Sequence, residues 1–79
     1  MVNWRERIVS NPGILGGKAV VAGTRISVEI ILEQLALEAT VEDVIEYYPF
    51  LTRDDVLAAL AYASEMAGER TAVAGAVSQ

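Results

Sequence analysis

The chain has 79 residues, enough for one domain with a modest core. It contains no Cys and no His, which excludes disulfides, thiolate chemistry and most transition-metal sites and favours a cytoplasmic protein. Hydrophobic residues make up 53% of it, more than so small a domain buries, and no apolar run approaches the roughly 18 residues of a membrane-spanning helix. We therefore expect exposed apolar surface that binds a second copy or a partner protein, and no membrane partner.

The formal net charge of −5 argues against a general affinity for nucleic acid, but the charge is unevenly distributed. Residues 1–27 carry Arg5, Arg7, Lys18 and Arg25 against Glu6 alone. Residues 28–79 carry two basic side chains against ten carboxylates. An anionic partner is therefore expected to meet the N-terminal third of the chain.

Residues 1–27 are predicted to form an N-terminal β arm. Turns are indicated at Asn11-Pro12-Gly13 and at Gly16-Gly17, and residues 19–22 have the composition of a short strand. The strand is expected to turn at Gly23-Thr24 and to continue through Arg25-Ile26. For residues 3–10 the periodicity does not distinguish a strand from a helical turn. An arm this poor in core residues must lie on the helices or on another copy of itself.

Three helices are predicted to follow the arm. Ser27 is a good N-cap for a helix over residues 28–38. Thr40 to Asp43 resembles a capping box for a helix over residues 41–48, which Pro49 ends. Thr52 repeats this pattern before a third helix, which is expected to end near Ala67 with Gly68 as a left-handed stop. Residues 69–79 are expected to form a flexible tail.

Apolar residues recur at helical spacing within each of these segments. The stripes expected to face the core are Val28, Ile31, Leu32 and Leu35; Val41, Val44, Ile45 and Tyr48; and Val56, Leu60 and Ala63. Phe50 and Leu51 are expected to fill the turn between the second and third helices. The pattern predicts a mainly α domain, with a three-helix core over residues 28–68 that contains a helix-turn-helix.

Two blocks of the sequence resemble a known family. The run from Asn11 to Val28 (NPGILGGKAVVAGTRISV) is similar to the signature of domain-of-unknown-function family 433, and Tyr48-Pro49-Phe50-Leu51 with residues 55–63 resembles its second block. The resemblance implies a homeodomain-like helical core with a β arm. It also implies an antitoxin of VapB type, encoded beside a toxin with a PIN-like ribonuclease fold.

Arg25 is the first candidate for binding an anion, because it is a lone cation between two short apolar runs. The alternative is a structural ion pair with Glu29, one helical turn further on, or with Glu33 of a second copy. An Arg25→Ala variant separates the two: an intact fold with lost binding indicates a binding role, whereas a lost fold or dimer indicates the ion pair.

The helix-turn-helix outline makes operator DNA a candidate partner. Its recognition helix would begin at Thr52-Arg53-Asp54-Asp55, where the two carboxylates favour helix capping over contact with phosphates. Base readout by this helix is therefore a weaker prediction than contact through the arm. The candidate DNA-binding residues are Arg5, Arg7, Lys18, Arg25 and Arg53.

A toxin or a second copy of the chain needs an apolar surface. The candidate residues for a partner or homodimer interface are Val20, Val21, Ile26, Ile30, Leu37, Tyr62 and Met66. By the family resemblance alone, Arg70 is the late candidate for the basic side chain that VapB-type antitoxins place in the acidic pocket of their toxin.

The predicted function is the antitoxin of a type II toxin–antitoxin module, which neutralises a PIN-like ribonuclease and regulates its own transcription. The alternatives are a stand-alone helix-turn-helix regulator and a module that binds only protein. Ser10 and Ser27 have no His to activate them, the carboxylates lack EF-hand spacing, and the glycines lack Walker or dinucleotide spacing. We therefore expect no enzymatic activity, no cofactor and no metal.

Overall fold

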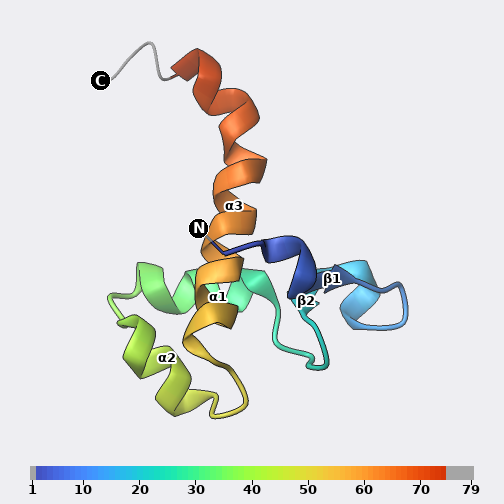
Figure 1. Ribbon diagram of the computed structural model, residues 1–79, viewed down its shortest axis with the longest axis vertical. Helices are drawn as coiled ribbons and strands as arrows, with labels where there is room; N and C mark the ends of the chain where they lie inside the picture. The colour runs from blue at the N-terminus through green and yellow to red at the C-terminus, as the bar shows by residue number, and fades with distance from the viewer. Residues whose placement is uncertain (1, 75–79) are drawn as a thin grey trace.

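The computed structural model describes residues 2–74, and the side chains of residues 2–68. Its elements are the strands β1 (Ile8–Ser10) and β2 (Ala19–Val21), the helices α1 (Val28–Ala36), α2 (Val41–Tyr47) and α3 (Arg53–Ala74), and the 3-10 turns η1 (Trp4–Glu6) and η2 (Leu15–Gly17). Figure 1 shows α1, α2 and the sheet gathered around the first half of α3, while its second half extends beyond them. A mainly helical fold with an N-terminal β arm is thus confirmed.

The arm folds as a small antiparallel sheet. β1 pairs with β2 in the register Ile8 to Val21 and Ser10 to Ala19. For residues 3–10 the periodicity did not distinguish a strand from a helical turn. The segment contains both, because the η1 turn precedes β1. The outer edge of β2 is bonded as well: the Val21 amide donates to the Ile26 carbonyl at 3.0 Å, and Val20 bridges to Ser27.

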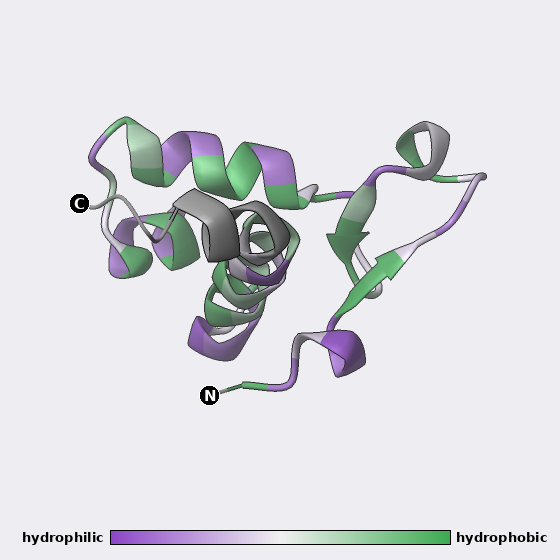
Figure 2. Ribbon diagram, turned by 90° about the horizontal axis from the view of Figure 1, so that it is seen from above, coloured by the Kyte–Doolittle hydropathy of each residue, from purple (hydrophilic) through white to green (hydrophobic). Residues whose placement is uncertain are grey.

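The sheet lies on the helices of its own chain and completes their core. Seen along α3, α1 and the sheet lie on different sides of this helix (Figure 2). Val20 and Val21 are buried, as is Ile8, so the prediction that these valines lie at an interface is corrected. The reason is that the short helices leave one side of α3 uncovered, and the arm supplies the missing apolar layer. The buried hydrophobic residues are Ile8, Val20, Val21, Val28, Ile31, Val44, Leu51, Val56, Ala58, Ala59 and Ala61.

Two predicted core positions face solvent instead. Leu60 is 37% exposed, whereas Ala58 and Ala59 are fully buried, so the core face of α3 is rotated from the predicted stripe. The small side chains allow the neighbouring elements to approach α3 closely. Phe50 is 85% exposed, and Leu51 alone fills the turn after α2.

The helix starts follow the predicted caps. The Ser27 hydroxyl accepts from the Ile30 amide at 3.1 Å, and Thr40 with Asp43 forms a complete capping box. α1 ends at Ala36, two residues before the prediction, because Glu38 adopts a positive φ of 75°.

α3 ends later than predicted. Its backbone stays helical through Gly68 to Ala74, and Gly68 does not have the positive φ of a helix stop. A glycine within a helix costs only about 1 kcal/mol relative to alanine, and the segment after it has helix-forming residues and no proline. Residues 75–79 of the predicted tail lie outside the described part of the chain.

Candidate functional site

An open apolar groove of about 700 Å³ lies between α1 and α3 and reaches β2. Its apolar lining comes from all three elements and consists of Ala19, Val28, Leu32, Ala36, Tyr62, Ala63, Met66 and Ala67. Trp4 of the arm packs its ring edge-on against Tyr62, with 4.8 Å between the ring centroids. The groove therefore depends on the arm being docked.

The rim of the groove carries three charged side chains, Lys18, Glu29 and Glu33. Lys18 Nζ lies 2.7 Å from Glu29 Oε1, and this hydrogen-bonded ion pair raises the pKa of Lys18 and lowers the pKa of Glu29. Glu33, the third charged lining residue, is exposed and has no ion pair among the side chains of residues 2–68. The net charge of the lining is therefore −1.

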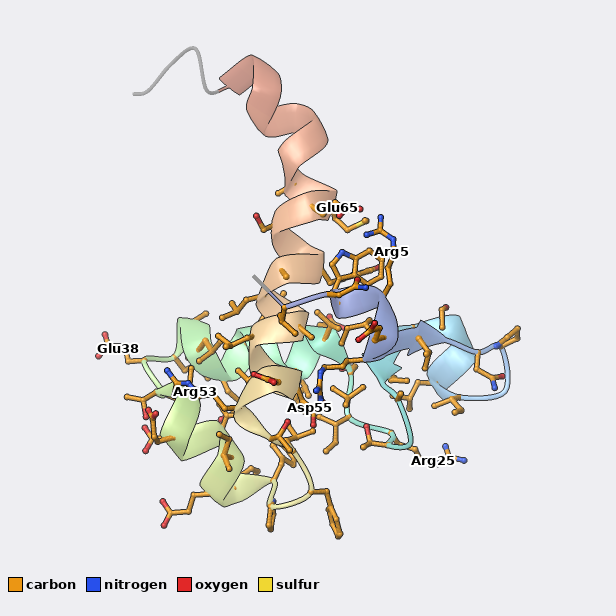
Figure 3. The ribbon with its side chains drawn as sticks, in the orientation of Figure 1. Arg5, Arg25, Glu38, Arg53, Asp55 and Glu65 are labelled. Atoms are coloured by element: carbon orange, nitrogen blue, oxygen red, sulfur yellow. The ribbon has the colours of Figure 1, made fainter. Side chains whose placement is uncertain are left out.

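Two arm cations are paired with acids of α3. Arg5 lies 2.8 Å from Glu65, and Arg7 lies 3.1 Å from Asp55 and 3.6 Å from Asp54. Figure 3 shows Arg5 next to Glu65, on the part of α3 beyond the sheet. The Trp4 indole N–H donates to Glu65 at 3.1 Å, and this hydrogen bond, followed by the Arg5 charge, lowers the pKa of Glu65.

Arg53, proposed for the start of a recognition helix, is paired too. Its guanidinium donates to Glu42 of α2. The pKa of Glu42 is lowered first by a hydrogen bond from its own backbone and then by Arg53. With Arg5, Arg7 and Lys18, four of the five predicted DNA-binding cations therefore form ion pairs within the chain.

Arg25 is the remaining cation. It is exposed, and it makes no ion pair or hydrogen bond to the side chains that the structure describes. Its predicted structural partner, Glu29, is bound by Lys18, so the expected intrachain pair is absent. Figure 3 shows Arg25 extending away from the loop between β2 and α1.

The loop that carries Arg25 is well braced. Gly23 has a φ of +80°, which favours glycine. The Thr24 hydroxyl donates to the Val21 carbonyl at 2.8 Å and accepts from the Ile26 amide at 3.0 Å. Arg25 is thus presented to solvent from a defined backbone.

The structure separates the predicted interface residues. Tyr62 and Met66 line the groove, whereas Ile26 and Ile30 are half-buried against the core. Leu37 is 74% exposed at the end of α1, outside the groove. The side chain of Arg70 lies outside those that the structure describes.

Sequence reasoning missed the groove itself. The sequence pattern predicts Leu32 in the core, whereas it lines the groove. The small residues that leave room for the groove are Ala36 on α1 and Ala63 and Ala67 on α3. The four-residue spacing of the two α3 alanines was the available signal. A second, smaller apolar hollow of about 370 Å³ lies on another side of α3, lined by Val2, Leu57, Leu60, Ala61 and Ser64.

The described part of the chain lacks two kinds of site. No group of three or more acidic, His or Cys side chains there is arranged to hold a metal ion. No helix within the described chain has both the length and the hydrophobicity to cross a membrane.

Comparison with known proteins places the chain in a family. It is 39% identical over 59 residues to the uncharacterized protein y4eO of Sinorhizobium fredii, a match that covers 75% of this chain and 27% of that protein. The matched part of the chain thus spans about a quarter of that relative's length. No solved structure matches. The family model described as "Protein of unknown function (DUF433)" matches residues 8–63, from β1 to the middle of α3, and the chain belongs to this family.

Proposed function

We propose that this protein is a protein-binding module of antitoxin type, which holds a PIN-like ribonuclease toxin in the groove between α1 and α3. The observation that carries the proposal is the apolar groove, which is built in part on the section of α3 that extends beyond the other elements. Exposed apolar surface of this kind on a small domain is typical of an interaction site. The toxin as partner comes from the family resemblance.

The distribution of charge supports a protein partner over nucleic acid. Four of the five candidate DNA-binding cations are neutralised by the chain's own acids, and the first turn of α3 carries Asp54 and Asp55. A helix that begins with two carboxylates repels the phosphates of a DNA groove.

Co-expression with the product of the neighbouring reading frame tests the proposal. We expect the two proteins to co-purify and the ribonuclease activity to be lost in the complex. Met66→Glu, which places a charge in the groove, should release the partner and restore the activity. Leu60→Glu is the matched control, since Leu60 is similarly exposed on α3 but outside the groove. A ribonuclease that stays active beside an excess of this protein would exclude inhibition.

Operator binding is the second candidate function, and it is favoured by Arg25, which has no ion pair among the described side chains. Arg25 and its copy in a dimer would supply two cations on braced loops for phosphate contacts. A retardation assay on the DNA upstream of the gene, across a salt series, tests this. We expect wild-type binding at low salt and weaker binding with Arg25→Ala. No binding by the wild type at low salt would reject this function.

A further inference from the structure

We infer that the groove between α1 and α3 binds an amphipathic helix of a partner protein, with apolar side chains against the groove and a Lys or Arg against Glu33. This inference rests on the protein-binding function proposed above and specifies the chemistry of the bound segment. It does not depend on the partner being a ribonuclease.

The shape of the groove favours a helix over other ligands. The groove is open along two helices, and a small molecule would remain largely in solvent there. Its small residues Ala36, Ala63 and Ala67 leave room for a third helix at the close distances of helix packing. A strand would need an unpaired sheet edge, whereas the outer edge of β2 already bonds to Ile26 and Ser27.

The charge of the rim specifies the sign of the charge on the partner helix. Lys18 and Glu29 neutralise each other at 2.7 Å, which leaves Glu33 as the lining charge without an ion pair among the described side chains. An apolar helix with a basic edge satisfies both the groove and Glu33.

The same charges argue against a second copy as the occupant. Residues 28–79 carry ten carboxylates against two basic residues, so a docked copy would bring further acids toward an acidic rim. Among the described side chains of α1, α2 and α3 the one cation is Arg53, and it is bound to Glu42. The described helices of a second copy therefore offer no free cation, and Arg25, which has no ion pair among the described side chains, lies on the loop between β2 and α1 and not on a helix.

Trp4 provides a built-in reporter of the groove. It is the one tryptophan of the chain, and it packs against Tyr62, which lines the groove. The probe is a leucine–lysine amphipathic peptide of about four helical turns. A leucine–glutamate peptide with the same apolar spacing serves as its control. Calorimetry measures the Kd, and Trp4 fluorescence reports occupancy.

We expect the lysine peptide to bind at least about tenfold more tightly than the glutamate peptide. Met66→Glu should abolish binding, and Glu33→Lys should weaken it by about three- to tenfold, because it replaces an attractive surface pair with a repulsive one. Glu46→Lys is the matched control, since it changes the net charge equally at an exposed position of α2 outside the groove. It should bind much like the wild type, and circular dichroism confirms that each variant is folded.

Equal binding of the two peptides, or equal effects of Glu33→Lys and Glu46→Lys, would overturn the inference. So would a dimer in sedimentation that Met66→Glu dissociates, since a second copy would then fill the groove. If the lysine peptide binds but the neighbouring gene product does not, the proposed toxin partner is rejected and the inference stands. A toxin that binds Glu33→Lys and Glu46→Lys equally well would support the proposed function and reject the inference.

Discussion

Arg7 of the arm and Asp55 of α3 are joined by an ion pair of 3.1 Å, in which the Asp55 side chain is only 13% exposed. The other oxygen of Asp55 accepts from the Thr52 amide at 2.9 Å, so one carboxylate caps α3 and holds the arm on it. We predict that Asp55→Ala lowers the free energy of unfolding by about 2 kcal/mol, because it removes a capping bond and leaves Arg7 only its longer contact of 3.6 Å with the exposed Asp54. Urea unfolding measures the loss.

The control for Asp55 is its neighbour. Asp54 is 58% exposed and lies 3.6 Å from the same guanidinium, so Asp54→Ala should change the stability by at most about 0.5 kcal/mol. Equal losses for the two variants would show that Asp55 does not connect the arm to α3.

Acid is expected to release the arm at its Trp4 end. The pKa of Glu65 is lowered below its ordinary value of 4.5 by the Trp4 indole and Arg5, so the folded state favours the charged carboxylate. The resulting stabilisation is fully present above pH 4.5 and is lost as the pH falls through the lowered pKa. Trp4 fluorescence should change over this acidic range, and Glu65→Gln should remove that transition. An unaltered transition in the variant would assign it to another group.

Two glycines should respond in opposite directions to alanine. Gly23 has a φ of +80° with open space around it, so Gly23→Ala should destabilise the protein by about 1 kcal/mol through backbone strain alone. Gly68 lies within α3 in open space, without a positive φ, so Gly68→Ala should stabilise it by about 0.5–1 kcal/mol. Thermal unfolding, in which about 1 kcal/mol shifts Tm by about 4–8 °C, measures both. A lower Tm for Gly68→Ala would instead place a helix stop there.

The core and the end of α1 should differ sharply in their tolerance of truncation. Ile31 is fully buried, and Ile31→Ala should cost about 2–4 kcal/mol by opening a cavity. Leu37, the C-cap of α1, is 74% exposed. Leu37→Ala should therefore change the free energy of unfolding by at most about 0.5 kcal/mol. Chemical unfolding compares the two, and a large loss for Leu37→Ala would indicate that Leu37 is buried in an oligomer.

Local chemistry in the sequence determined the starts of the elements. Ser27, Thr40 and Thr52 begin helices because their hydroxyls accept backbone hydrogen bonds within the next turn. The turns of the arm and the mainly helical class follow from glycine, proline and apolar spacing in the same way. Such signals depend on neighbouring residues, so one sequence suffices to find them.

Only the tertiary structure decided how the charges and apolar faces are used. Arg7 and Asp55 are 48 residues apart, and the ion pair that neutralises this arm cation exists because the arm packs on α3. The same packing buried Val20 and Val21, rotated the core face of α3 away from Leu60, and left the groove beside Met66 open. The sequence by itself determined which residues bear charge and where helices begin. Which of the described charges lack an ion pair, Arg25 and Glu33 among them, depended on long-range contacts that no local pattern encodes.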